Sequence, residues 1–231
     1  MWKEAVEIHK KIAYVPGDVN LWPNLTGGEV IDLFINLRGC EGKSRKDELI
    51  ERFKLDPSKK CRTYSKGNRQ KVALIAAFAT DADFYILDEP TSGLDPLMEK
   101  VFHDCVFEVK RAGKSVLLSS HILSEVEKLC DRVAIIREGQ IIEKGTLGEL
   151  RHLTRTNIKV KTKKDINLLK EMEGIYSLEE KEGQLSFQVE TSHLGDVLTY
   201  LCQYDIADLQ CLPPTLEELF MNHYKGDGGE K

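Results

Sequence analysis

The sequence has no long hydrophobic run and no closely paired cysteines. Its longest uncharged apolar stretch, residues 72–80, is far shorter than the about 20 residues that span a bilayer, so we expect a partner to supply any membrane-spanning part. Residues 2–4 (WKE) begin no apolar segment of the kind found in a secretory signal. The scattered cysteines favour reduced thiols in a cytoplasmic protein. They are Cys40, Cys61, Cys105, Cys130, Cys202 and Cys211.

The chain also has little excess of charge. Its 33 basic and 38 acidic residues give a net charge of −5, which argues against a nucleic-acid-binding protein. The one basic run, residues 159–164 (KVKTKK), alternates with apolar residues and is predicted to be the solvated face of a strand. With 41% hydrophobic residues over 231 positions, the chain is long enough for one large or two modest globular domains.

Apolar strand patterns alternate with helical patterns over residues 1–153, which we interpret as one domain. A helical subdomain is predicted at about residues 26–80. The alternation favours an α/β fold with a mostly parallel sheet. The predicted strands are residues 12–15, 84–87 and 115–119, followed by a strand pair at 132–137 and 141–142.

Several helix ends carry recognisable signals. Thr26 and Glu29 form a capping-box pattern before one helix, and Ser124 with Glu127 is predicted to cap another. A helix predicted over residues 96–111 begins with proline, which is favoured at the first helical position. A shorter helix is predicted at about residues 45–54.

A second domain is predicted after residue 153, where the composition shifts. Its elements follow the order β-α-β-β-α-β, which matches the ferredoxin-like split βαβ unit. They are strands at residues 157–162, 175–181, 184–190 and 206–211 and helices at residues 165–172, 192–204 and 215–223. We therefore expect a small α+β domain over residues 154–225, followed by a disordered tail over residues 226–231.

The strand at residues 84–87 ends in two acids, Asp88 and Glu89, and Pro90 stops it. Carboxylates at the end of a buried strand are costly unless a cation or a reaction uses them. Ligands of open α/β sheets bind at the carboxyl ends of the strands, so the pair indicates a Mg²⁺-nucleotide site. A strand-ending acidic turn is the plain alternative.

Residues 64–68 (YSKGN) form a polar turn before an apolar helical run. Ser65 and the Gly67 amide would then lie at a helix N-terminus, where phosphate groups bind. Taken alone, the segment is equally a turn with an N-cap serine. By the same reasoning Asp95 is an N-cap by position, and His121 is an ordinary polar residue at a strand end.

In their order along the chain, these segments resemble the motifs of the ATP-binding subunits of exporter-type ABC (ATP-binding cassette) transporters. Residues 64–68 resemble the family signature, usually written LSGGQ, and the strand ending at Asp88 resembles Walker B. Glu89 stands at the position of the catalytic glutamate. Residues 92–95 (SGLD) match the D-loop, and His121 matches the switch histidine.

The resemblance covers residues 1 to about 150 and implies a partial P-loop NTPase (ABC ATPase) core that uses ATP and Mg²⁺. It implies that Asp88 holds Mg²⁺, Glu89 orients or deprotonates the attacking water, and His121 touches the γ-phosphate. The C-terminal domain resembles the accessory domain of exporter-type ATPases. We expect a membrane-spanning permease subunit as partner, at the cytoplasmic face of the membrane, and no nucleic acid.

In this family the signature serves the nucleotide held by the opposite subunit, so the resemblance implies a dimer with an identical or a different ATP-binding subunit. It also implies which residues contact that nucleotide. They are Ser65, Lys66, Gly67, Asn68 and Asp95.

The sequence departs from the family pattern in two places. Gly17 and Asp18 stand where the Q-loop glutamine is expected, and we expect Asp18 to take part of its role in coordinating metal or sensing the permease. The sequence also contains no G-x-x-x-x-G-K-[ST] loop, which in the family precedes the Q-loop and cradles the phosphates. We therefore expect an ABC ATPase truncated before the Q-loop, inactive alone, with an apolar sheet edge exposed.

Two alternatives to an exporter subunit stay open. One is a non-catalytic remnant that lends only its signature half-site to an intact partner. The other is a non-transport ABC ATPase of DNA repair or translation. The acidic charge balance, the single signature and the absence of long heptad arms stand against it. The transported substrate, whether a drug, an antibiotic or a lipid, is left open.

Overall fold

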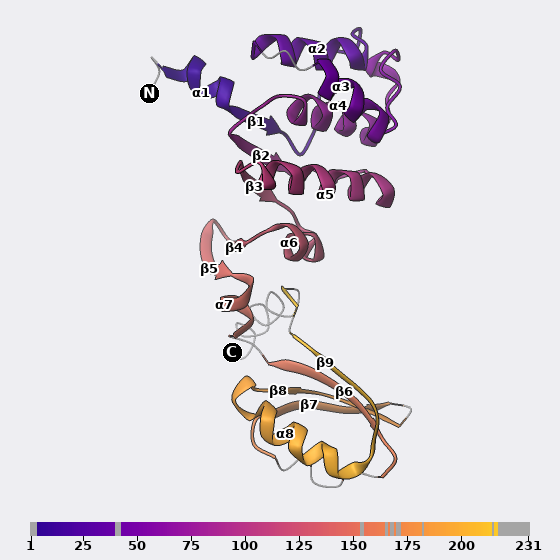
Figure 1. Ribbon diagram of the computed structural model, residues 1–231, viewed down its shortest axis with the longest axis vertical. Coiled ribbons are helices and arrows are strands. Elements are labelled where there is room, and N and C mark those ends of the chain that lie inside the picture. Colours follow the sequence, from indigo (N-terminus) through magenta and orange to yellow (C-terminus); the bar gives the residue numbers. More distant parts are fainter. Residues whose placement is uncertain are drawn as a thin grey trace. The chain divides into compact units, whose positions relative to one another are not determined.

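The computed structural model describes residues 4–39, 43–152, 155–164, 166, 169, 172–181, 183–213 and 215–216 (Figure 1). The chain divides into two compact units, Met1–Leu129 (unit 1) and Cys130–Lys231 (unit 2). The domain boundary near residue 153 stays a prediction. Within the described ranges, no helix has both the length and the apolar character needed to cross a membrane.

Unit 1 is built on a three-stranded parallel sheet in the order β1-β2-β3. The strands are β1 (Ile12–Val15), β2 (Phe84–Asp88) and β3 (Ser115–Ser119). They lie where the sequence predicted strands, and β2 extends by one residue to include Asp88. Parallel strands need helical crossovers between them, so this pairing confirms the predicted α/β class.

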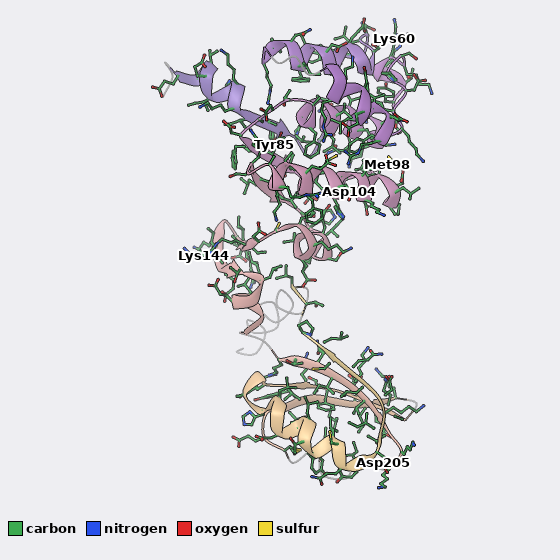
Figure 2. The ribbon with its side chains drawn as sticks, in the orientation of Figure 1. Lys60, Tyr85, Met98, Asp104, Lys144 and Asp205 are labelled. Atoms are coloured by element: carbon green, nitrogen blue, oxygen red, sulfur yellow. The ribbon has the colours of Figure 1, made fainter. Side chains whose placement is uncertain are left out.

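One face of this sheet is buried and the other is partly open. The buried side chains alternate along the strands and are Ala13, Val15, Tyr85 (labelled in Figure 2) and Leu87. On the opposite face Tyr14 pairs in register with Ile86, and Ile86 with Leu117. Tyr14 and Leu117 are 58% and 57% exposed. Because parallel sheets are usually covered on both faces, this exposed apolar face is unusual for the fold.

The predicted helical subdomain is present in unit 1, and its helices lie together in Figure 1. They are α2 (Gly27–Leu37), α3 (Lys43–Arg52), the short 3-10 helix η2 (Cys61–Thr63) and α4 (Lys66–Phe78). A separate exposed helix, α1 (Ala5–Lys11), precedes β1.

The capping box predicted at the start of α2 is confirmed. The N–H of Glu29 donates to Thr26 Oγ1 at 3.2 Å, and the N–H of Thr26 donates to Glu29 Oε2 at 2.6 Å. Helix α3 instead begins two residues before the predicted Arg45 and ends at Arg52. It ends early because Lys54 adopts a left-handed backbone with φ of 50°, which no longer continues a right-handed helix.

Helix α5 (Pro96–Arg111) has the bounds that the sequence predicted. Asp95 caps it, since Asp95 Oδ1 accepts hydrogen bonds from the N–H groups of Leu97 and Met98 at 3.0 and 3.1 Å. The helix lies beside β2 and β3 in Figure 1, and Met98 is buried. The N-cap interpretation of Asp95 is therefore correct.

The predicted cap of helix α6 (Leu123–Leu129) is wrong. Ser124 lies inside the helix rather than before it. Ser120 supplies the local bond instead, because its Oγ accepts from the N–H of Ile122 at 3.0 Å. Ser120, four residues before Ser124, therefore forms the turn that leads into α6.

Unit 2 begins with the predicted hairpin, β4 (Arg132–Arg137) and β5 (Gln140–Thr146), which pair antiparallel. Its turn residues Glu138 and Gly139 both have positive φ, as a tight two-residue hairpin requires. Helix α7 (Leu147–His152) follows, and the N–H of Glu149 donates to Thr146 Oγ1 at 3.1 Å.

The rest of unit 2 is an antiparallel sheet in the order β7-β8-β6-β9, packed against α8 (Leu194–Leu201). This agrees with the predicted ferredoxin-like α+β arrangement. The strands are β6 (Thr156–Thr162), β7 (Ile175–Lys181), β8 (Gln184–Val189) and β9 (Ile206–Leu212), with 3-10 turns η4 (Thr191–His193) and η5 (Cys202–Tyr204). Most of the predicted helices 165–172 and 215–223, and all of the tail 226–231, lie outside the described residues.

Candidate functional site

Strand β2 carries the acidic pair to the carboxyl end of the sheet. Asp88 is its last residue, and Glu89 follows with a left-handed φ of 44°. The N–H of Glu89 donates to the carbonyl oxygen of Ser119 at 3.0 Å, which ties the turn after β2 to the end of β3. Such a backbone costs a non-glycine residue about 1 kcal/mol or more, so surrounding contacts must hold it.

Glu89 and His121 are in direct contact. Nδ1 of His121 lies 2.7 Å from Oε2 of Glu89. An ionised carboxylate only accepts hydrogen bonds, so this contact requires the proton on Nδ1 and leaves Nε2 for another group. The His121 side chain is 76% exposed and the Glu89 side chain 32%, so a ligand can reach both.

Asp88 is held from two sides. Its Oδ1 accepts from the hydroxyl of Ser119 at 2.5 Å, and its Oδ2 accepts from the N–H of Gly17 at 3.3 Å. A Cβ at position 17 would lie 3.1 Å from Asp88 Oδ2, so a glycine allows this close approach. The side chain of Asp18, next in the chain, makes no hydrogen bond or ion pair to a described residue.

The signature segment begins helix α4. Ser65 is the N-cap, and its Oγ accepts from the N–H of Asn68 at 3.3 Å. The ammonium of Lys66 donates to the hydroxyl of Ser92 at 2.7 Å. The N-cap interpretation of Ser65 is correct, and the segment also contacts the loop that follows β2.

That loop, residues 89–95, packs tightly on the start of α4. A Cβ at Gly67 would overlap the carbonyl oxygen of Gly93, and Gly93 itself has a positive φ of 80°. The buried side-chain amide of Gln70 donates to the carbonyl oxygen of Pro90 at 3.0 Å. Two glycines and a buried glutamine therefore fix the loop against the helix.

The structure brings Asp88, Glu89 and His121 together at the ends of β2 and β3. Ser65, Lys66, Gly67 and Asn68 form a second group at the start of α4, with Asp95 at the far end of the intervening loop. Sequence reasoning missed the supporting residues Ser119 and Gln70, and it placed Ser92 in the D-loop without predicting its contact with Lys66. Only their position beside strand ends and motif segments could have indicated them.

Two arginines of α3 form a clamp with Glu108 near the C-terminal end of α5. Arg52 donates to Glu108 Oε1 at 2.9 Å, and Arg45 also contacts the Glu108 carboxylate. Hydrogen bonds from Arg52 and Arg45 lower the pKa of Glu108 below its ordinary value. The clamp borders a cavity of about 390 Å³, which none of the predicted site residues line.

Two family profiles match the chain. The profile described as "ABC transporter" matches residues 2–92, and that described as "ATP-binding protein DrrA1-3-like, C-terminal domain" matches residues 145–224. The first match includes the signature segment and the acidic pair.

Known proteins resemble most of the chain. It is 30% identical to an uncharacterised ABC transporter ATP-binding protein of Alkalihalophilus pseudofirmus, over 91% of this chain and 82% of the relative. It is also 30% identical to the linearmycin resistance ATP-binding protein LnrL of Bacillus subtilis, over 95% of this chain and 76% of the relative.

A solved structure, described as the ATP-binding subunit of an ABC transporter, superposes with a TM-score of 0.61 and 32% identity. The superposition covers 66% of this chain and 65% of that chain. The fold of the matched part is that of ABC ATPase domains. The chain therefore belongs to the ABC transporter ATP-binding protein family.

Proposed function

We propose that this chain is the ATP-binding and ATP-hydrolysing subunit of an ABC exporter and couples hydrolysis to transport through a separate membrane subunit. One observation carries the proposal: Glu89 and His121 are in contact at 2.7 Å, directly beside Asp88 at the ends of two adjacent parallel strands. Phosphoryl transfer needs a positioned water and a compensated phosphate charge more than covalent chemistry.

Asp88 suits a Mg²⁺ ion. Each of its two oxygens accepts one hydrogen bond from the protein, whereas a carboxylate offers about four lone-pair positions in all. Mg²⁺ in nucleotide sites is bound through one or two carboxylates together with phosphate oxygens and water. The ion would neutralise phosphate charge, and the Gly17 amide and Ser119 hydroxyl would hold the carboxylate in place for it.

Glu89 would orient the attacking water and accept its proton. His121, with Nδ1 on Glu89, would keep the carboxylate in position and present Nε2 toward the γ-phosphate. The left-handed backbone of Glu89 and its bond to Ser119 support this role, because they fix the residue at the end of β2, where its carboxylate contacts His121.

The start of α4 would serve a nucleotide held by a second ATP-binding subunit, identical or different. Ser65, Lys66, Gly67 and Asn68 lie at a helix N-terminus, which favours a phosphate. Lys66 also contacts Ser92, so a nucleotide bound at residues 65–68 would also affect the loop that ends at Asp95. For Asp18 we propose a lesser role, in metal coordination or in sensing the permease.

The sequence contains no G-x-x-x-x-G-K-[ST] loop, and we propose that the chain by itself neither binds nor hydrolyses ATP measurably. Fluorescent ATP-analogue binding to the purified chain tests this, and submicromolar binding would contradict it. An in-frame loop of this pattern in the upstream coding DNA would supply the missing phosphate cradle. In a protein with that loop, Glu89→Gln is expected to lower kcat by about 100-fold or more with ATP still bound.

A second candidate is a half-site donor that lends only its signature to an intact cassette. The N-capped start of α4 favours it, since residues of this chain alone form that segment. Titrating the chain into an intact cassette whose own signature serine is replaced should restore ATPase activity. Ser65→Ala should prevent the rescue. No rescue by the unchanged chain would argue against this role.

Location and transport need their own test. We propose a site on the cytoplasmic face of the membrane, beside a permease that exports a drug, antibiotic or lipid. Co-purification with a membrane protein from detergent extracts, followed by ATP-dependent efflux from reconstituted vesicles, checks both. Co-purification with nucleic acid instead would favour a non-transport ABC ATPase.

A further inference from the structure

Glu125 is a buried carboxylate that the mechanism above does not use. It belongs to α6 and is 4% exposed. Its Oε2 accepts from the hydroxyl of Ser120 at 2.8 Å and from that of Thr91 at 3.3 Å, and its Oε1 lies 3.5 Å from Nε2 of His103. A buried carboxylate is costly without such partners, so this arrangement is specific.

Its partners lie in three different elements. Thr91 belongs to the loop after β2, two residues beyond Glu89. Ser120 directly precedes His121 in the loop after β3. His103 belongs to α5. One carboxylate oxygen therefore joins the loop that carries Glu89 to the loop that carries His121.

Ser120 also holds the backbone around His121. While its hydroxyl donates to Glu125, its Oγ accepts from the N–H of Ile122, so the backbone on both sides of His121 is held. Thr91 is likewise buried, and the N–H of Leu94 donates to its carbonyl oxygen at 3.0 Å. A shift of either hydroxyl must therefore move the backbone that positions Glu89 or His121.

We propose that Glu125 is a positioning residue that sets the separation of Glu89 and His121, acting through Thr91 and Ser120. The catalytic consequence rests on the proposed ATPase function. The link between the loops does not, because it consists of hydrogen bonds within this chain and is measurable without hydrolysis.

Amide hydrogen exchange tests the link. Reporters are the hydrogen-bonded N–H groups of Ser92 and Leu94 in one loop and Ile122 in the other, with Val30 in α2 as a distant control. Glu125→Ala should raise exchange at all three reporters by about tenfold or more and leave Val30 unchanged. Glu125→Gln keeps an acceptor oxygen for both hydroxyls and should restore most of the protection.

Two hydroxyl variants keep the test valid if Glu125→Ala does not fold. Thr91→Val should raise exchange at Ile122, and Ser120→Ala should raise it at Leu94, each by about threefold or more across Glu125. Effects confined to the substituted loop in both variants would overturn the proposal. So would equal increases at Val30 and at the three reporters in Glu125→Ala.

The catalytic arm uses an assembly that hydrolyses ATP. Glu125→Ala should lower kcat by about 10-fold to 100-fold with KM nearly unchanged, and Glu125→Gln should recover most of kcat. A normal kcat in Glu125→Ala would overturn the positioning role. If the unchanged chain supports no hydrolysis in any assembly, the proposed function fails, whereas the exchange result for the loops still stands or falls by itself.

Discussion

The contact between Gly67 and Gly93 allows a sharp test of how tightly the loop after β2 is packed. Gly67 is the second residue of α4, where alanine would ordinarily be the better helix former. Here a Cβ would overlap the carbonyl oxygen of Gly93, which is backbone and not a flexible side-chain end. Gly67→Ala must therefore push the loop away from the helix.

One stabilising and two destabilising terms decide the change in the free energy of unfolding. Replacing a helical glycine with alanine stabilises by about 0.5–1 kcal/mol. Forcing an extra methyl group into a packed contact costs about 1–3 kcal/mol. Movement of the loop also weakens the buried bond from Gln70 to Pro90, worth about 0.5–1.5 kcal/mol. The sum predicts that Gly67→Ala destabilises unit 1 by about 0.5–4 kcal/mol, with a central value of about 2 kcal/mol.

Urea unfolding followed by tryptophan fluorescence measures this change in unit 1. The sequence has two tryptophans, Trp2 and Trp22, and both belong to unit 1. Gly195 provides the matched control, because it is also the second residue of a helix but has no atom within 4 Å of a built Cβ. Gly195→Ala should stabilise unit 2, read from slower exchange of β6 amides, by about 0.5–1 kcal/mol.

Gly67→Ala and Gly195→Ala must therefore change the free energy of unfolding in opposite directions. A Gly67→Ala variant as stable as the unchanged chain, or more stable, would refute the steric argument. It would mean that residues 89–95 yield to the helix at little cost.

Three further predictions concern unit 1. Burial raises the pKa of Cys105 to about 12. At pH 8 its alkylation should therefore be at least about 100-fold slower than that of exposed Cys202. Peptide mass spectrometry measures both rates, and equal rates would contradict this. The lowered pKa of Glu108 gives stability that is present above its ordinary value of 4.5 and is lost as pH falls through the lowered value. Glu108→Gln should therefore cost about 1 kcal/mol at pH 7 in urea unfolding, with the difference closing toward pH 3; a gap that stays constant would exclude the ion pairs as its cause. Phe102 is fully buried against Phe78, and Phe102→Ala should cost about 3–5 kcal/mol, whereas Phe107→Ala on the exposed side of the same helix should cost much less in the same assay.

The ends of α2 and α5 were predictable because their signals are local. Asp95 accepts from amides two and three residues further on, and Thr26 and Glu29 satisfy each other's backbone. Bonds that close within one helical turn need no information from the rest of the chain. The bounds of α5 and the start of α2 therefore followed from sequence alone.

The start of α6 was mispredicted because two serines compete for the capping role. Ser124 matched the capping pattern, but Ser120 starts the turn. The choice depends on Glu125, whose buried carboxylate accepts from Ser120 and keeps that serine at the end of β3. This carboxylate also takes a bond from Thr91, a residue 34 positions earlier, which no local pattern contains.

For the candidate site, too, the sequence indicated some features and left others to tertiary contacts. The sequence, through its family resemblance, indicated that Asp88, Glu89 and His121 form one group, and the structure brings these side chains together. The roles of these residues stay predictions. The sequence did not indicate that the Gly17 amide, 71 positions away, would hold Asp88, because that contact exists only once β1 pairs with β2.

Local patterns in the sequence were enough to identify the parallel strands, the capped starts of α2, α4 and α5, and the carboxylates and histidine at strand ends. Those depend on propensity, periodicity and bonds within one turn. Which loops touch depends on tertiary packing. The close approach of Gly67 to Gly93 and the bridge from Thr91 through Glu125 to Ser120 join residues far apart in the chain. Their positions follow from packing α4, α5 and α6 around one sheet, and close packing leaves little tolerance for other arrangements.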